Sequence, residues 1–210
     1  MSPKDHLTAI FDADRALRKA EAQLVKADAS ALAELLALSV DEAKALSSAD
    51  EAEAELRLVR LADLCAQVPG QRMADALVRI LDEENPAVRV QAAEALVDVA
   101  YDRYVEVARA IEGVLEKGVQ GPAMRELPWV VAEVAEPSAA RLISRFLTQD
   151  TAEIVASAIE ALAQLGDPTA LPALRKLQDD PREVTMDDGH DEQTTTIGEL
   201  ASEAVEALSD

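Results

Sequence analysis

The chain has one cysteine and few aromatic residues, and each scarcity narrows the class of protein. A single cysteine, Cys65, forms no disulfide within one chain, which favours a reducing compartment. Because Cys65 lies in a helical apolar pattern, we expect an inert core thiol. Aromatic residues are only 2% of the sequence, so the 49% hydrophobic content is mostly alanine, leucine and valine. That composition is typical of packed helices, and the predicted fold class is all-α.

Positive charge is also scarce, with 20 basic against 41 acidic residues and a formal net charge of −21. A field of this sign repels phosphate backbones and anionic headgroups, so we expect no nucleic-acid partner. No apolar run of about 18 residues is present, and no signal peptide precedes the first amphipathic helix, so we expect no membrane insertion. These features predict a cytoplasmic protein.

A nine-residue pattern recurs along the chain. Val88–Leu96 (VRVQAAEAL) returns as Ile154–Leu162 (IVASAIEAL) and as Leu200–Leu208 (LASEAVEAL). Each copy opens on an aliphatic residue, has small residues in the middle and closes on Glu-Ala-Leu. Repetition at intervals of tens of residues is typical of stacked helical repeats.

Proline and glycine divide the chain into helix pairs from residue 50 onward. The predicted pairs are 51–68 with 71–83, 86–100 with 103–117, 122–135 with 138–148, and 152–165 with 168–178, followed by a half pair at 196–208. We therefore predict an α-solenoid over residues 50–210.

Residues 1–49 lack the nine-residue pattern. We predict that they form a divergent N-terminal helical cap, with an independent dimerisation coil as the alternative. Residues 4–27 predict one long amphipathic helix, and Asp28 is a candidate cap for the next. Capping-box spacing over residues 39–42 then predicts a break and a short helix to Leu46.

Several motifs of the repeated part resemble a known family. The Val88-Arg89 step, the run AAEAL at 92–96 and LGDPTALPAL at 165–174 resemble HEAT repeats of the bacterial type, including the HEAT-like repeats named after phycobilisome lyases. The resemblance covers about residues 50–210 and implies a right-handed solenoid whose second helices line a concave surface. The third pair departs from the pattern, because Pro128 falls inside its first helix and predicts a kink beside Trp129.

The spacing of the first helices leaves a surplus at residues 179–195, which predicts an acidic insertion. Its possible ligands are Asp179, Asp180, Glu183, Asp187, Asp188, His190, Asp191 and Glu192. Such oxygens suit a hard cation such as calcium, but their order does not match a calcium-binding loop, so we assign no metal. A solvated loop and a contact loop for a partner remain the alternatives.

Basic residues gather on the second helices. The candidate partner-binding residues there are Arg79, Arg109, Arg141, Arg145, Arg175 and Lys176. On a concave surface these cations would engage an acidic segment of a protein partner. Alternatively, each pairs with a carboxylate of a neighbouring repeat and contributes only to solubility. Tyr101 and Tyr104 are further candidates for the interface, or else fill space between helices.

The sequence offers little for catalysis. The two histidines, His6 and His190, are far apart in a linear stack, and no phosphate-binding loop, nucleophile elbow or Cys/His metal cluster is present. We therefore predict a non-enzymatic adaptor or scaffold that needs no cofactor. An accessory subunit of an enzyme like the phycobilin lyases is the alternative, and the sequence does not predict the oligomeric state.

Overall fold

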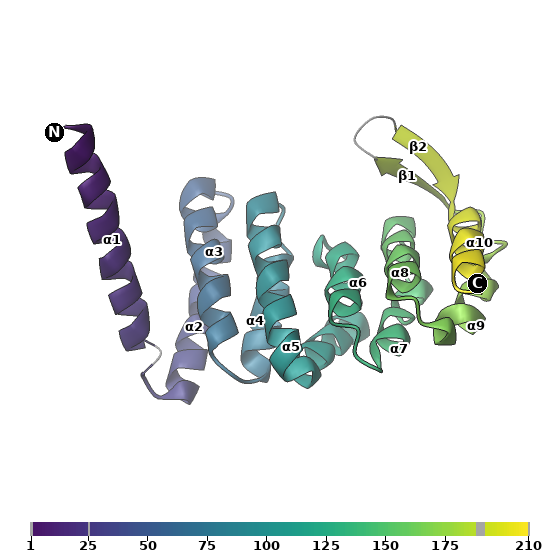
Figure 1. Cartoon of the computed structure of the whole chain (residues 1–210), viewed down its shortest axis with the longest axis horizontal. Coiled ribbons are helices and arrows are strands. Elements are labelled where there is room, and N and C mark those ends of the chain that lie inside the picture. Colours follow the sequence, from purple (N-terminus) through teal and green to yellow (C-terminus); the bar gives the residue numbers. More distant parts are fainter. Residues whose placement is uncertain (1, 25, 188–191, 210) are drawn as a thin grey trace.

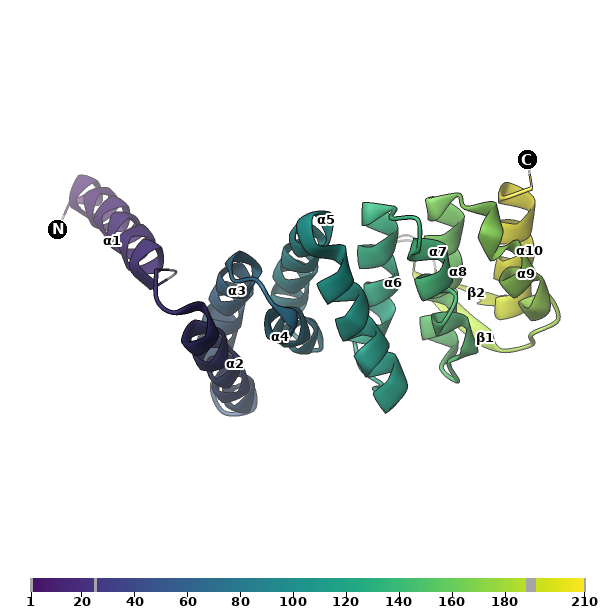
Figure 2. The ribbon, with the colours of Figure 1, turned by 90° about the horizontal axis from the view of Figure 1, so that it is seen from below.

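The structure is a row of helices standing side by side along the long axis of the molecule. It is a computed structural model that describes residues 2–24, 26–187 and 192–209. The two ends of the chain lie at opposite ends of the row (Figure 1). Figure 2 shows the same order of helices from below. The molecule is therefore an all-α solenoid with one small β-hairpin at its C-terminal end.

The helices follow the predicted pairs closely. They are α1 (Pro3–Leu24), α2 (Ala29–Leu46), α3 (Glu51–Gln67), α4 (Gln71–Leu81), α5 (Pro86–Lys117), α6 (Ala123–Val134), α7 (Ala139–Ile143), α8 (Ala152–Leu165), α9 (Leu171–Leu174) and α10 (Ile197–Ala207). Short 3-10 turns flank α7 and α9, namely η1 (Phe146–Thr148), η2 (Pro168–Ala170) and η3 (Arg175–Leu177). The strands are β1 (Glu183–Asp187) and β2 (Glu192–Thr196).

The helices form two layers. In the first layer α3 contacts α5, α5 contacts α6, and α8 lies between α6 and α10. In the second layer α2 contacts α4, which packs against α5. Because α2 packs on both α3 and α4, it belongs to the stack although its sequence lacks the repeated pattern.

The turn expected near residue 101 is present as a bend inside α5. Arg103 leaves the helical conformation there, with φ −141° and ψ 45°, and divides α5 into the first and second helix of one pair. Its guanidinium donates to the carbonyl oxygens of Val68 at 3.0 Å and Ala66 at 2.6 Å. Arg103 thus satisfies carbonyls at the C-terminal end of α3 that helical geometry leaves without partners.

The nine-residue pattern packs the core. In its first copy Val88, Ala92 and Leu96 are buried, and in the second Ile154, Ala158 and Leu162 occupy the same positions. The third copy is terminal, and Leu200 and Leu208 are only partly buried. The nine-residue pattern is therefore part of the structural framework.

The break predicted in the second helix is wrong. α2 continues through residues 39–42, because Leu32, Leu36, Val40 and Ala43 form one continuous buried stripe. Burial of Val40 outweighs the capping signal of the residues around it. The predicted cap at the start of α2 is confirmed, since the Asp28 carboxylate accepts from the amides of Ser30 and Ala31 at 3.1 and 2.9 Å.

The insertion at 179–195 holds an antiparallel hairpin where we had predicted a loop. β1 pairs with β2 in a register that runs from Glu183 opposite Thr196 to Asp187 opposite Glu192. Val184 is buried, and Thr196 forms a capping box with Glu199 at the start of α10. Both ends of the hairpin are thereby fixed to the stack.

The first helix of the third pair is not interrupted at Pro128, where the sequence predicts a kink. α6 continues through Pro128, which is buried, and Trp129 packs against the core while remaining partly exposed.

Across the described parts of the chain, no helix is long and apolar enough to cross a membrane.

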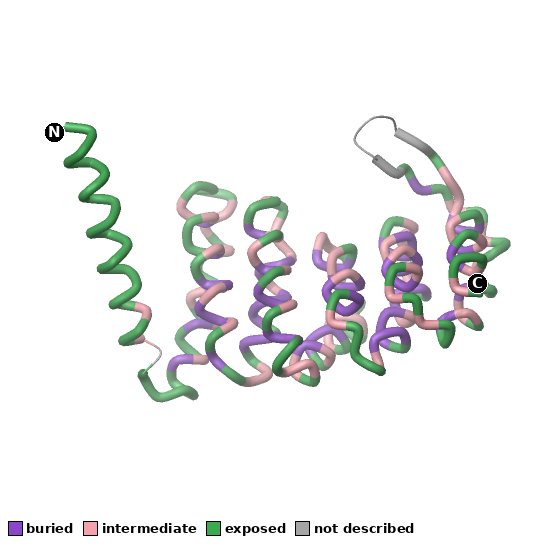
Figure 3. The backbone as a smooth tube through the Cα atoms, viewed as in Figure 1, coloured by how far each residue is buried: buried purple, intermediate pink, exposed green. Residues whose placement is uncertain are grey.

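α1 stands apart from the stack at the N-terminal end. None of its residues is buried, and Figure 3 shows it exposed along nearly its whole length. The structure therefore contains an amphipathic helix whose apolar face is not covered by its own chain.

The close approach at Gly198 leads to a test of how α10 docks. A Cβ atom there would lie 2.6 Å from the Gln178 carbonyl oxygen and 3.1 Å from that of Asp180. We expect Gly198→Ala to lower the free energy of unfolding by about 1–3 kcal/mol, measured by urea denaturation. Gly113→Ala, inside α5 where a Cβ meets nothing within 4 Å, is the control and should raise it by about 0.5–1 kcal/mol. Equal changes in the two variants would contradict this packing.

A second test concerns Arg182, which ties the hairpin to the preceding turn. Its guanidinium donates to the Gln149 and Asp150 carbonyl oxygens, both at 2.9 Å, and binds the Asp180 carboxylate. The hydrogen bonds that Arg182 donates to the Asp180 carboxylate hold the pKa of Asp180 below its usual 3.8. Arg182→Met should lower the free energy of unfolding by about 1–2 kcal/mol at pH 7.

The pH dependence of that loss follows from the sign of the Asp180 shift. A depressed pKa in the folded state gives stability that is present above pH 3.8 and is lost as the carboxyl protonates below it. The difference between wild type and Arg182→Met should therefore shrink below pH 3.8. A difference that stays constant between pH 7 and pH 3 in urea denaturation would refute the role of this pair.

Candidate functional site

The structure places all six candidate cations in or next to the second helices of the pairs. Arg79 lies on α4, Arg109 on the second half of α5, and Arg141 on α7. Arg145 directly precedes η1, and Arg175 with Lys176 forms most of η3. The predicted gathering of positive charge on one set of helices is therefore present in the fold.

Two of these cations are neutralised by neighbouring repeats. The Arg79 guanidinium lies 2.5 Å from the Asp41 carboxylate on α2. The Arg145 guanidinium lies 3.1 Å from Glu112 and 4.0 Å from Glu116, both on α5. Such half-exposed pairs are worth about 0–1 kcal/mol each, and they join adjacent helices.

The other four remain exposed without an acidic partner. Arg109, Arg141, Arg175 and Lys176 have no carboxylate within 4 Å among the residues that the structure describes. Acidic residues outnumber basic ones by two to one, so the lack of a partner does not reflect a shortage of carboxylates. We refer to these four residues as the basic surface.

The two tyrosines differ in their exposure. Tyr101 is 60% exposed, and its hydroxyl donates to the Glu133 carbonyl oxygen on α6 at 3.3 Å. Tyr104 is half-buried, and burial raises its pKa, while the neighbouring Ser138 side chain opposes the shift. Tyr104 thus packs between helices, whereas Tyr101 presents an aromatic ring at the bend of α5.

A groove between α5 and α6 was missed at the level of sequence. It has a volume of about 550 Å³ and is lined by Ala93, Glu94, Val97, Asp98, Glu126, Trp129, Val130 and Glu133. Its floor is apolar and its rim acidic. The spacing of Glu94 and Asp98 on one helix face was the available signal, but the facing residues of α6 come from another repeat.

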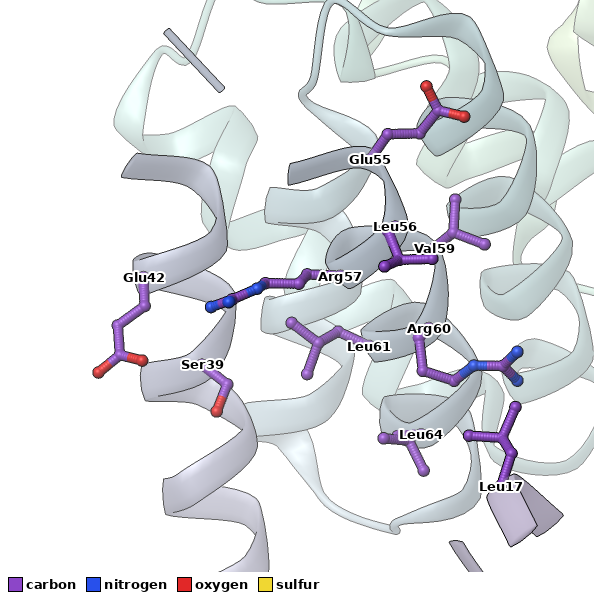
Figure 4. Close-up of a pocket in the computed structure, with 10 residues that line it drawn as sticks. All are labelled: Leu17, Ser39, Glu42, Glu55, Leu56, Arg57, Val59, Arg60, Leu61 and Leu64. Atoms are coloured by element: carbon purple, nitrogen blue, oxygen red, sulfur yellow. The ribbon is translucent and has the colours of Figure 1, made fainter. Parts of the chain in front are cut away.

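A second groove lies at the N-terminal end of the stack. It has a volume of about 600 Å³ and is lined by Leu17 of α1, Ser39 and Glu42 of α2, and residues 55–57, 59–61 and 64 of α3. Figure 4 shows Leu56, Val59, Leu61 and Leu64 along α3, with Leu17 opposite them. The Glu21 carboxylate of α1 reaches Arg60 of α3 at 3.1 Å, so the C-terminal end of α1 touches the middle of α3. We refer to this feature as the end groove.

The described residues do not assemble a recognisable catalytic or metal centre. No group of three or more His, Cys, Asp or Glu side chains among them is placed to hold a metal ion. The insertion residues Asp188, His190 and Asp191, which were among the possible cation ligands, lie outside the described residues. Cys65 is buried, and burial raises its pKa to about 12, so the thiol is unreactive, as expected.

Comparison with known proteins gives one family match. Residues 116–187 match the model of HEAT repeats, a segment that runs from the end of α5 to β1. No curated protein matches the sequence.

Some solved structures have similar arrangements of helices. An engineered protein is 17% identical with a TM-score of 0.38 over 83% of this chain and 48% of its own, so this chain spans about half its length. A designed armadillo repeat protein is 17% identical with a TM-score of 0.39 over 90% and 98% of the two chains. Another, solved in complex with the peptide (KR)4, is 18% identical with a TM-score of 0.37 over 90% and 97%.

The family match and the architecture agree. Pairs of helices stack through a repeated apolar pattern, and the segment that matches HEAT repeats lies within that stack. A fold of this type commonly mediates contacts between proteins and is typically non-catalytic. Residues 116–187 therefore resemble HEAT repeats, and they lie within an all-α solenoid.

Proposed function

We propose that the chain is a non-enzymatic scaffold that binds a protein partner through the basic surface of its second helices. The observation that carries this proposal is the exposure of Arg109, Arg141, Arg175 and Lys176 without acidic partners in a chain of net charge −21. Arg79 and Arg145, in contrast, are paired with carboxylates of neighbouring helices. The unpaired four are free to bind carboxylates of another molecule.

The spacing of the second helices defines the partner's chemistry. Neighbouring helices pack about 10 Å apart, and an extended chain advances about 3.3 Å per residue. An extended segment with Asp or Glu at every third residue therefore matches the basic surface, one carboxylate to each helix. The net negative charge of the chain repels acidic segments in general. A segment whose carboxylates do not match the spacing of the cations therefore meets this repulsion without compensating contacts.

Tyr101 and Tyr104 have different roles in this proposal. The exposed ring of Tyr101 adds an aromatic contact beside the bound segment, as aromatic residues commonly do at interfaces. Tyr104 supports the helix that carries Arg109 and makes no direct contact. The single buried thiol suits a reducing compartment, so we place the scaffold in a bacterial cytoplasm.

A labelled peptide tests the basic surface. The probe is a twelve-residue peptide with Glu at every third position and Ser or Ala elsewhere, and the measurement is fluorescence anisotropy. Arg109→Glu combined with Arg141→Glu should weaken binding at least tenfold, because each change replaces a charge-assisted hydrogen bond by repulsion. The circular dichroism of the variant should be unchanged, because both residues are exposed.

Arg125 supplies a matched control for the charge change. It is exposed on α6, a helix of the first layer, and Arg125→Glu should alter the affinity for the peptide less than about twofold. Arg141→Glu alone is compared with Arg125→Glu alone, because each variant changes the net charge by the same amount. If both single variants lose affinity equally, general repulsion explains the result and the basic surface is not the site.

A further inference from the structure

Large apolar side chains are exposed mainly at the N-terminal end of the molecule. Seven of the ten such residues lie within the first 56 positions of the chain. They are Leu7, Ile10, Phe11 and Leu17 on α1, Leu35 and Leu38 on α2, and Leu56 on α3, with exposed fractions between 37% and 68%. A concentration of this kind marks an interaction surface, because single scattered apolar residues are the norm on monomers.

α1 has an exposed apolar stripe. At 100° per residue, Ile10, Leu17 and the alanines at 9, 13, 16 and 20 fall within about 120° of the helix circumference. Asp12, Arg15 and Lys19 occupy the opposite side. Such a stripe is wide enough to pack against a neighbouring helix. The end groove supplies a matching surface, lined by Leu56, Val59, Leu61 and Leu64.

The charges of α1 are divided between its two halves. Residues 3–14 contain Lys4 against Asp5, Asp12 and Asp14, a net charge of −2, and residues 15–24 contain Arg15, Arg18 and Lys19 against Glu21, a net charge of +2. α3 is also acidic in its first half, with Glu51, Glu53 and Glu55 against Arg57, and has no net charge in its second half, with Arg60 and Asp63. The whole formal charge of −21 therefore lies outside α1.

This polarity decides which copy of α1 fits the end groove. In one chain α1 and α3 run in the same direction, and their C-terminal halves meet at the Glu21–Arg60 pair (Figure 1). Closing α1 onto α3 of its own chain would place the acidic half of α1 beside the acidic half of α3. A helix in the opposite direction would instead place its basic half beside the acidic half of α3.

We propose that two copies of the chain form a dimer through α1. Each α1 enters the end groove of the second copy and packs antiparallel against α3 there, while the two α1 helices pack antiparallel against each other. A two-fold axis perpendicular to the helices generates this arrangement and joins the first layers of both copies into one row. The acidic half of each α1 then faces the basic half of the other.

The contact is large enough for a stable dimer. A helix of this length measures about 33 Å, and three helix contacts roughly 10 Å wide cover on the order of 2,000 Å² of total surface, above the 1,200 Å² typical of specific interfaces. Two chains of charge −21 repel each other at most other surfaces. α1 has equal numbers of acidic and basic residues, so two chains can meet there without this repulsion.

Sedimentation equilibrium of the full chain tests the dimer. Wild type should have twice the mass of one chain at micromolar concentration. Ile10→Asp combined with Leu17→Asp should raise the dimer dissociation constant at least about a hundredfold, because both side chains leave the apolar contact. The control is Val90→Asp combined with Val105→Asp, two side chains that are each 59% exposed on α5, and it should remain dimeric. A monomeric wild type, or a dimer that survives the α1 variant, would overturn the proposal.

A charge exchange tests the pairing between copies. Arg15→Glu with Arg18→Glu and Lys19→Glu makes α1 acidic throughout, and Asp5→Lys with Asp12→Lys and Asp14→Lys makes it basic throughout. Each triple variant alone should be monomeric where wild type is dimeric, and an equimolar mixture should restore a two-chain species. If mixing restores no dimer, or if either variant dimerises alone as wild type does, α1 does not pair with α1. Helical circular dichroism confirms that the variants fold.

Discussion

The stack depends on small residues that are fully buried where helices meet. Ala62, Ala92, Ala158 and Ala161 are inaccessible to solvent, and leucine or isoleucine fills the space beside them. Small side chains let helix axes approach closely, and each repeat then buries its apolar face only against its neighbours. No repeat is complete alone, so each helix pair depends on its neighbours. α10 packs against α8 and carries the hairpin, while at the other end of the stack α3 is left with an open groove.

The helix pairs were predictable because their signals are local. Proline or glycine follows the ends of α3, α5 and α8, and the nine-residue pattern places Val88 and Ile154 at equivalent buried positions. The failures occurred where burial by distant residues decided the outcome. Burial of Val40 keeps α2 helical despite the capping signal at residues 39–42. The pairing of Thr185 with Thr194 forms a hairpin from a polar segment that lacks a long apolar alternation.

The candidate site was only half predictable for the same reason. Alignment of the repeats placed the cations on second helices, but it gave no information on which of them meet a carboxylate. The acids that neutralise Arg79 and Arg145 lie 38 and 33 residues away in sequence, on helices that stacking brings alongside. The distinction between a paired arginine that joins repeats and a free one that is available to a partner is therefore a property of packing. The same holds for the two grooves, whose walls come from different repeats.

The charge distribution connects the two proposals. All of the excess negative charge lies outside α1, so two copies experience strong repulsion unless they meet at the end where α1 stands. Association at that end leaves Arg109, Arg141 and Arg175 uncovered in both copies, since these residues lie on later repeats. A dimer of this form carries two basic surfaces in one continuous row. A partner with two acidic segments would then bind both surfaces of one dimer, and the second segment would bind at the high effective concentration that the first one creates. The neutral helix that permits dimerisation thus also sets the distance between the binding surfaces.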